Sequence, residues 1–218
     1  MTHPLPQDPH GDTSSRLMDA AATVFADRGL REATVRDICA LAGANVAAIH
    51  YHFGSKEELY LATLRRALRQ HFDAHPLPSL APLDPEVDPA GARAQLEAVV
   101  RGIGQGILGP APEWHTRLLL RCLLEADFAL PTVLEEFLGP RFGVLRGVLA
   151  VHLPGKDAQV VVRHALSVVA QLVFYRAFPG VALHFLGATE LTPELRAAAV
   201  DHVVTSTRRV LEAARRAP

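Results

Sequence analysis

The sequence is short of cysteine and of charge, and each shortage excludes a class of protein. Its two cysteines, Cys39 and Cys122, lie far apart in 218 residues and supply no disulfide framework, which favours a reduced, cytoplasmic setting. Charged residues make up 21% and the formal net charge is −1, so any contact with nucleic acid must be local. The N-terminal residues are too polar for a signal peptide. The longest uncharged apolar run, Ala165–Tyr175, is too short to cross a bilayer.

Signatures of catalysis and of metal binding are missing as well. The sequence contains no G-x-S-x-G, P-loop, H-E-x-x-H or paired-cysteine pattern, so we expect neither an enzyme nor a cofactor. His50 and His52 are two residues apart, and side chains at that spacing on a helix diverge, so no metal site is predicted. The segment Gly104–Gly109 matches a dinucleotide fingerprint literally. No strand precedes it and Pro110 prevents the required helix, so we interpret it as a helix end and turn.

The sequence does have helical periodicity over most of its length. Apolar residues make up 49%, enough for a sizeable core, and they recur at intervals of three and four. Prolines predict a disordered tail over residues 1–12 and an extended linker over 75–90. We therefore predict an all-α chain with a three-helix domain over 13–60 and a larger helical domain over 61–218. The helices expected after the linker cover residues 91–108, 113–128, 132–152, 157–177 and 193–216.

The first of these domains carries the signals of a helix-turn-helix. Thr34 and Asp37 have the spacing of a capping box at the start of the second helix. Gly43 supplies a residue that tolerates positive φ at the turn, and Asn45 can cap the third helix. The third helix is rich in small residues and slim enough to enter a major groove, while Ile49 anchors it to the core.

The stretch Thr34–Leu59 resembles the DNA-binding domain of the TetR family of transcriptional regulators. The matching features are Thr34, the Ala42-Gly43 turn, His52-Phe53 and Ser55-Lys56-Glu57, all in fixed register. The variant that begins at Asn45 is most similar to the CecR subgroup. The resemblance implies a TetR-like fold, in which the larger C-terminal domain binds a ligand and forms a dimer. It also implies a set of residues that contact double-stranded DNA: Thr34, Arg36, Asn45, Val46, Ala47, Ala48, His50, Tyr51, His52 and Lys56.

The resemblance assigns different tasks to these residues. Arg36 reaches a guanine edge or a phosphate, while His52 and Lys56 hold phosphates. The sequence departs from the family at His50, which stands where a phosphate-binding tyrosine is usual. Because the third helix has no Arg or Lys, we expect specificity from Arg36, from thymine methyl contacts and from DNA shape. Replacing Lys56 by alanine is then expected to weaken binding to all sequences and to flatten its salt dependence.

The larger domain offers candidates for a sensor site and for a dimer interface. Helices 157–177 and 193–216 are more apolar than a monomer needs, so we expect them to form a four-helix dimer bundle. Arg121 is the favoured polar group for a small-molecule effector, although a self-paired stripe with Arg117 and Glu125 is an alternative. The full set of candidate ligand-binding residues is Trp114, Leu118, Arg121, Glu125, Phe128, Phe137, Gln171, Phe174 and Tyr175.

These inferences predict a cytoplasmic regulator, most simply a repressor that binds a palindromic operator as a dimer and is released by a small molecule. An alternative is a helical interaction module whose helix-turn-helix is vestigial, since the third helix is neutral and carries His50. An enzyme is a further alternative, and the polar residues of the C-terminal half are too scattered to favour it.

Overall fold

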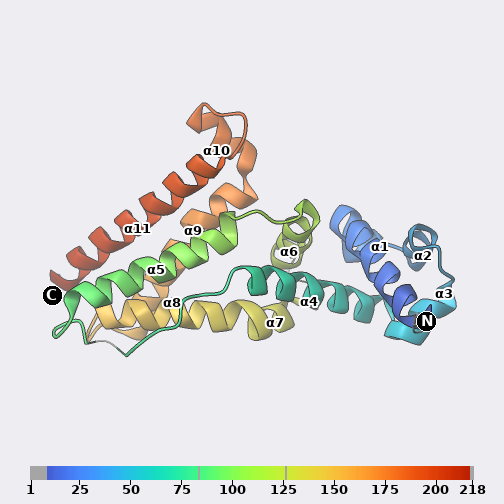
Figure 1. Cartoon of the computed structure of the whole chain (residues 1–218), viewed down its shortest axis with the longest axis horizontal. Helices are drawn as coiled ribbons and strands as arrows, with labels where there is room; N and C mark the ends of the chain where they lie inside the picture. Colours follow the sequence, from blue (N-terminus) through green and yellow to red (C-terminus); the bar gives the residue numbers. More distant parts are fainter. Residues whose placement is uncertain (1–8, 83, 126, 217–218) are drawn as a thin grey trace, which may run out of the picture. The chain divides into compact units, whose positions relative to one another are not determined.

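A computed structural model describes residues 9–82, 84–125 and 127–216 of the chain (Figure 1). These residues form helices joined by turns and loops, so the predicted all-α class is confirmed. The chain divides into two compact units. The N-terminal unit comprises Met1–Gln70 and Ala111–Val133, and the C-terminal unit comprises His71–Pro110 and Leu134–Pro218. The boundary at residue 60 that the sequence suggested for the DNA-binding domain remains a prediction.

The N-terminal unit is built from the first helices and from a pair that follows much later in the sequence. Its helices are α1 (Pro9–Glu32), α2 (Val35–Ala42), α3 (Val46–Phe53), most of α4 (Lys56–Ala74), α6 (Glu113–Glu125) and α7 (Leu130–Val133). The proposed tail is shorter than expected because residues 9–12 already belong to α1; residues 1–8 lie outside the described part. Gly29 breaks the regular geometry of α1 with a φ of 75°, a conformation that glycine adopts without steric cost.

Large apolar side chains from several helices form the core of the N-terminal unit. Phe25 of α1 and Tyr60 of α4 are both buried, and their rings meet edge to face with centroids 5.0 Å apart. Helix α6 packs against α1 and contributes Leu118 and Cys122, both without exposed surface. Helices α2 and α3 therefore stand on a scaffold assembled from segments distant in the sequence.

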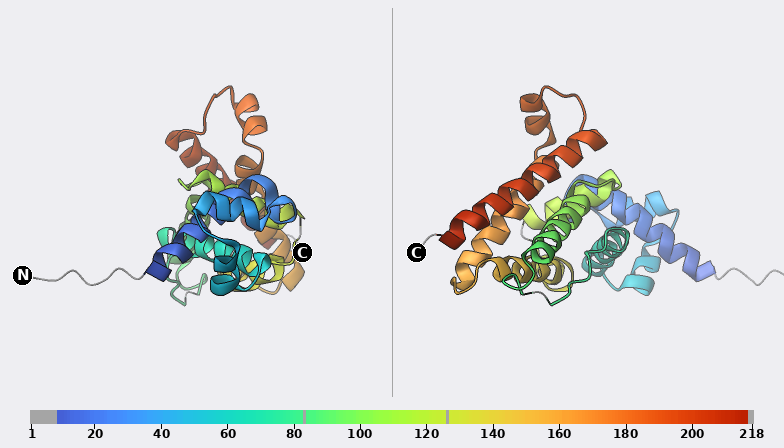
Figure 2. Two further views of the ribbon diagram at one scale, coloured as in Figure 1. Left: turned by 90° about the vertical axis from the view of Figure 1, so that its right-hand side faces the viewer. Right: turned by 60° about the vertical axis from the view of Figure 1, so that its left-hand side comes forward.

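The C-terminal unit is a bundle of long helices. Its helices are α5 (Pro89–Leu108), a short π-helical turn (Leu134–Leu138), α8 (Gly139–His152), α9 (Ala158–Ala177), α10 (Pro179–Leu186) and α11 (Pro193–Arg216). Helices α5, α8, α9 and α11 pack on one another around an apolar core, and Figure 2 shows α11 (red) alongside α5 (green). Residues 75–82 and 84–88 form no helix, as their prolines predict.

The structure adds two features that the sequence did not predict. The segment predicted as one helix over 132–152 is helical throughout, but it contains a π-helical turn at Leu134–Leu138 before α8 begins at Gly139. Pro140 explains this change because proline lacks the N–H of the helical ladder and is tolerated in the first turn of a new helix. Helix α10 was not predicted, although Pro179 at its start and left-handed Gly187 at its end are boundary signals.

The glycine-rich segment of α5 permits a close helix contact and does not form a phosphate loop. Gly102, Gly104 and Gly106 lie within α5 and are buried. A Cβ atom on Gly104 would lie 2.7 Å from Cγ2 of Val200 on α11, closer than side chains normally approach. The glycine therefore sets how closely α5 and α11 pack.

Helix α9 has one buried stripe and a large remaining apolar surface. Val161, Ala165, Val168 and Leu172 recur at helical spacing and are buried against the core. Among the described helices, α9 is the one whose length and composition would suffice to cross a membrane. Its contacts with α5, α8 and α11 identify it as a core helix of the bundle.

Candidate nucleic-acid interface

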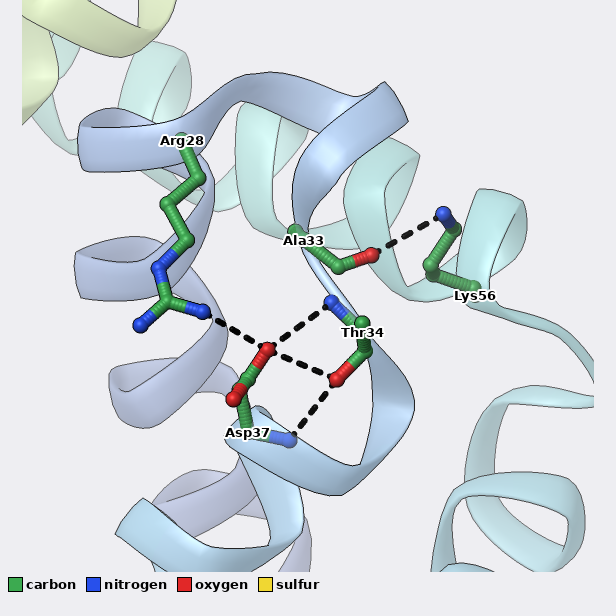
Figure 3. Close-up of polar contacts among 5 residues, drawn as sticks. All are labelled: Arg28, Ala33, Thr34, Asp37 and Lys56. Atoms are coloured by element: carbon green, nitrogen blue, oxygen red, sulfur yellow. Dashed lines mark hydrogen bonds and ion pairs between the residues drawn. The ribbon is translucent and has the colours of Figure 1, made fainter.

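Helix α2 is fixed at its start by a reciprocal cap (Figure 3). The Thr34 hydroxyl accepts a hydrogen bond from the Asp37 N–H at 3.1 Å, while the Asp37 carboxylate accepts from the Thr34 N–H at 3.3 Å. Arg28 of α1 donates to the same carboxylate at 2.8 Å. The hydrogen bond from Thr34, followed by the charge of Arg28, lowers the pKa of Asp37 below its usual 3.8. The predicted capping box is confirmed, and the ion pair with Arg28 joins it to α1.

The turn between α2 and α3 follows the expected chemistry. Gly43 adopts a left-handed conformation (φ 60°, ψ 39°), and its N–H bonds to the Cys39 carbonyl. Two residues later the Asn45 side chain accepts from the Ala48 N–H at 2.9 Å and caps α3. The two helices are thus set at a fixed turn by local hydrogen bonds.

Helix α3 is anchored by one side and exposed on the other. It has only eight residues, too few to be stable alone, so its position depends on its caps and on Ile49. Ile49 has no exposed surface, and burying a side chain of this size contributes about 1.5–3 kcal/mol. On the outer side Val46 is 42% exposed and Tyr51 75% exposed, and Ala47 is exposed between them in sequence. A narrow, uncharged face is thereby presented to solvent.

The histidines of α3 end the helix. Nδ1 of His50 lies 2.9 Å from the carbonyl oxygen of Gly54, so the tautomer with its hydrogen on Nδ1 donates to this carbonyl at the end of the helix. The rings of Tyr51 and His52 meet edge to face with centroids 4.9 Å apart. His50 is exposed beside Tyr51 in sequence, and its other ring nitrogen is not part of the bond to Gly54.

Lys56 has a structural task that the sequence did not reveal. Its ammonium group donates to the carbonyl of Leu30 in α1 at 2.8 Å and to that of Ala33, between α1 and α2, at 3.0 Å. Figure 3 shows the bond to Ala33. An ammonium has three N–H donors, so these bonds use two of them. The phosphate contact expected of Lys56 stays a prediction, and the side chain also holds the scaffold of the motif.

Arg16 is a further cation near the turn, and the sequence did not predict its position there. Its Nη1 lies 4.0 Å from where a Cβ atom on Gly43 would stand, and Nη2 donates to Thr13. Arg36, the expected contact on α2, has an exposed side chain. The helix-turn-helix therefore has an uncharged central face with arginines on the neighbouring helices.

Comparison with known families shows which proteins share this helix-turn-helix. The model for bacterial regulatory proteins of the tetR family matches residues 17–63, which contain α2 and α3. The model for the C-terminal domain of the HTH-type transcriptional dual regulator CecR matches residues 92–214, more than half of the chain. The chain belongs to the TetR family.

Individual relatives agree with this TetR assignment. The HTH-type transcriptional repressor KstR2 of Rhodococcus jostii is 40% identical over 102 residues, which are 46% of this chain and 47% of the relative. The HTH-type transcriptional dual regulator CecR of Shigella flexneri is 55% identical over 47 residues, 22% of this chain and 21% of the relative. The matched segments thus span less than half the length of these relatives.

Solved structures show the same TetR fold over nearly the whole chain. A TetR-like transcriptional regulator from Rhodococcus sp. RHA1 superposes with a TM-score of 0.61 at 20% identity, covering 95% of this chain and 98% of that one. The sequence resemblance stated for residues 34–59, and the predicted TetR-like architecture, are confirmed.

The residues predicted to form a TetR ligand site are divided between the two units. Trp114, Leu118, Arg121, Glu125 and Phe128 belong to the N-terminal unit. Leu118 is part of the core there, and Phe128 is half exposed, with its ring 6.1 Å from that of Tyr60. Phe137, Gln171, Phe174 and Tyr175 belong to the C-terminal unit. Gln171 lies on α9 beside a shallow groove, and Phe174 contacts Phe178 at a centroid distance of 5.6 Å.

Arg121 is bound to the end of α1 and is not free to serve as a polar handle. Its guanidinium donates to the carbonyls of Ala26 at 3.1 Å and Asp27 at 2.8 Å, and it pairs with Glu125 at 3.0 Å. These are among the last carbonyls before the break at Gly29, where the helix leaves carbonyl groups unsatisfied. The alternative of a self-paired stripe describes Arg121 and Glu125 better than the ligand-binding interpretation.

A second polar network in the N-terminal unit, centred on Asp127, was not predicted from the sequence. Asp127, between α6 and α7, accepts from the Tyr60 hydroxyl at 2.5 Å, from the Ala129 N–H at 2.9 Å and from the Cys122 thiol at 3.4 Å. Burial, with Asp127 beside it, raises the pKa of Tyr60 above its usual 10 and that of Cys122 to about 12. Both groups stay protonated and donate, so the carboxylate connects α4 to α6.

Proposed function

We propose that this TetR-family protein is a transcriptional regulator, most simply a repressor, that binds a palindromic operator as a dimer. The observation that carries the proposal is the outer face of α3, where Val46, Ala47 and Tyr51 are exposed on a helix held by Ile49 and Asn45. A helix of this kind fits a major groove about 12 Å wide. Its small apolar side chains suit thymine methyl groups.

Contacts to phosphate supply most of the affinity in this proposal. Arg16 of α1, Arg36 of α2 and the third donor of Lys56 on α4 supply the positive charge in this proposal, and His52 of α3 offers a hydrogen-bond donor. Without Arg or Lys on α3, base discrimination depends on Arg36, on methyl contacts and on the shape of the duplex. We expect salt-sensitive binding with modest sequence specificity.

The proposed dimer forms through α9 and α11. Leu166 on α9 is 54% exposed and Val210 on α11 is 48% exposed, although both belong to helices of the apolar bundle. Between the two helices lies a shallow groove with a volume of about 40 Å³, lined by Ser167, Val168 and Leu211 among others. A two-fold pairing of α9 and α11 would cover these side chains and produce a four-helix interface.

The C-terminal unit is the proposed sensor of a small molecule. A transcriptional regulator of this fold from Saccharomonospora viridis, 18% identical over 93% of this chain (96% of that one; TM-score 0.58), was solved in complex with choline. That structure supports the capacity of the fold to hold a small molecule. Because α4 continues from the DNA-binding motif into the C-terminal unit, and Asp127 ties it to α6, we expect α4 to transmit the effector signal.

Selection from random duplexes tests the DNA-binding proposal. The purified full-length protein should enrich a palindromic sequence in the cytoplasmic range of ionic strength. Replacing exposed Tyr51 by alanine should weaken binding to the selected site about tenfold, whereas Arg209→Ala on the exposed side of α11 should leave it unchanged. Enrichment of no sequence would instead favour a helical interaction module with a vestigial motif.

A further inference from the structure

Four basic side chains gather near the C-terminal end of α5, all within the C-terminal unit. His71 and His75 come from the end of α4 and the segment after it, Arg141 from α8 and Arg176 from α9. The two imidazole rings have centroids 4.8 Å apart. All four side chains are partly buried, and we call them the basic cluster.

Two members of the basic cluster, Arg176 and His71, bind carbonyl groups at the C-terminal end of α5. Arg176 donates to the carbonyls of Ile107 at 2.7 Å and Gly109 at 2.5 Å, and His71 Nε2 lies 2.7 Å from that of Gly106. The last carbonyls of a helix lack intrahelical partners and carry partial negative charge, so they attract such donors. These bonds hold Arg176 and His71 in place.

The position of Arg141 is not explained by bonds to the end of α5. It makes one hydrogen bond, to the carbonyl of His75 at 2.7 Å, and its guanidinium carbon lies 4.4 Å from the centre of the Phe72 ring. A guanidinium has five N–H donors, so this bond leaves most of them available. The aromatic contact orients the guanidinium plane without satisfying those donors.

No carboxylate of the described residues forms an ion pair with the cluster. Burial lowers the pKa of His71, and the neighbouring charges His75, Arg176 and Arg141 lower it further, opposed by the Gly106 carbonyl. Burial also lowers the pKa of Arg141 and of Arg176. Partly buried cations without a counterion are unfavourable, so a bound anion would relieve the site.

Apolar surface lies directly beside the cluster. The rings of Phe72 and Phe137 stack with centroids 6.3 Å apart, and Tyr175 and Ile107 pack against the core as partly buried side chains. Cationic donors next to aromatic surface match a molecule with a charged head and an apolar body.

We propose that the basic cluster binds the carboxylate or phosphate head of an organic anion, with Arg141 as its main contact and with the apolar body against Phe72 and Phe137. This inference rests on the proposed sensor role of the C-terminal unit and specifies the class of effector. Arg176 then contributes charge, His71 helps to hold the end of α5 in position, and Arg141 supplies the hydrogen-bond fork.

Matched probes separate charge from hydrophobicity in the test. Binding of octanoate, octyl phosphate and octanamide to the full-length protein is measured by calorimetry and by the shift in unfolding temperature, at constant ionic strength. At least one anion should bind saturably and at least tenfold more tightly than octanamide. The anion that binds identifies the head group as carboxylate or phosphate.

Two variants on α8 locate the binding site. Arg141→Met should weaken anion binding at least tenfold, whereas Arg146→Met, on the same helix but exposed, should leave it unchanged. Arg141→Lys retains the charge and a donor for the His75 carbonyl, and it should bind with intermediate affinity even if the methionine variant unfolds. Equal binding of octanamide, equal loss in both methionine variants, or no saturable anion binding would each overturn the inference.

Operator binding, measured separately without any anion, distinguishes this inference from the proposed function. A protein that binds its selected duplex but none of the anions contradicts the effector class alone. A protein that binds an anion through Arg141 but enriches no duplex contradicts the regulatory proposal and leaves the anion site in place.

Discussion

Three basic side chains bind the carbonyls at the ends of helices, and they do so across long sequence separations. Lys56 reaches the carbonyls of Leu30 and Ala33, Arg121 binds the end of α1, and Arg176 binds the end of α5. Each bond offsets the partial negative charge and the unpaired oxygens that a helix leaves at its C-terminus. These three cations therefore hold helices together, whatever part they also take in binding DNA or an effector.

Replacing Lys56 by methionine tests this assignment. Loss of two hydrogen bonds from a charged, partly buried donor should lower the free energy of unfolding by about 2 kcal/mol, measured by urea denaturation. The slope of log affinity against log salt for operator binding should change by less than about 0.9, the value for one full phosphate contact. The exposed control Arg31→Met should change stability little. If the slope changed by about 0.9 while stability stayed the same, the main role of Lys56 would be to bind a phosphate.

Replacing Thr34 by alanine tests the cap of α2. The lost cap should cost about 1 kcal/mol of stability. The pKa of Asp37 should rise toward 3.8, because the Thr34 hydrogen bond is the largest cause of its depression. With a depressed pKa in the folded state, Asp37 contributes stability above pH 3.8 that is lost as pH falls through the folded-state value.

Carboxyl carbon chemical shifts, followed by NMR from pH 2 to 6, measure this pKa directly. Thr23→Ala, an exposed change on α1 with only a bond to its own helix, serves as the control and should leave Asp37 unaffected. An Asp37 pKa that stays depressed in Thr34→Ala would assign the effect to Arg28 instead.

At the scale of elements, the sequence predicted what local interactions determine. Thr34, Asp37, Gly43 and Asn45 cap or turn the chain within three or four residues of their partners, so spacing alone revealed their roles. Arg121 meets carbonyls 94 and 95 residues away, a contact that no periodicity encodes. For the same reason the basic cluster, drawn from several helices, could not be found in the sequence.

Helix boundaries also differ in how well the sequence predicts them. The bounds of α9 and α11 were predicted almost to the residue because long apolar periods end there at polar or proline signals. The π-helical turn before α8 was not predicted because residues 132–152 keep a helical period through Gly139 and Pro140. Periodicity records which face is buried, and it does not record a change in the hydrogen-bond ladder.

The contact between α5 and α11 provides a prediction with its own control. Gly104→Ala should lower the free energy of unfolding by about 1–3 kcal/mol, because the new methyl group would meet stiff, β-branched Val200 at 2.7 Å. Gly147→Ala on α8 meets no atom within 4 Å and should raise stability by about 0.5–1 kcal/mol through helix propensity. Thermal and urea unfolding compare the two. A neutral Gly104→Ala would show that the helices separate easily at this point.

At the scale of the whole molecule, the apolar composition of α9 and α11 is the basis for the proposed dimer. One face of α9 contributes Val161, Ala165 and Leu172 to the core of its own unit. Outside this buried stripe, Leu166 is an exposed apolar side chain of the same helix. A solvated helix of a monomer would carry charged residues there. The excess of apolar surface is therefore the physical basis for expecting a second copy of the chain.

Charge placed on this face should separate the copies. Because a two-fold interface presents each residue twice, Leu166→Glu brings two carboxylates into one apolar contact, and we expect a monomer at micromolar concentration by analytical ultracentrifugation. Operator affinity should then fall about a hundredfold or more, since one motif loses the effective concentration that its partner provides. Ala150→Glu, exposed on α8, should remain dimeric and bind normally. If Leu166→Glu still sedimented as a dimer, the interface would have to be sought elsewhere on the C-terminal unit.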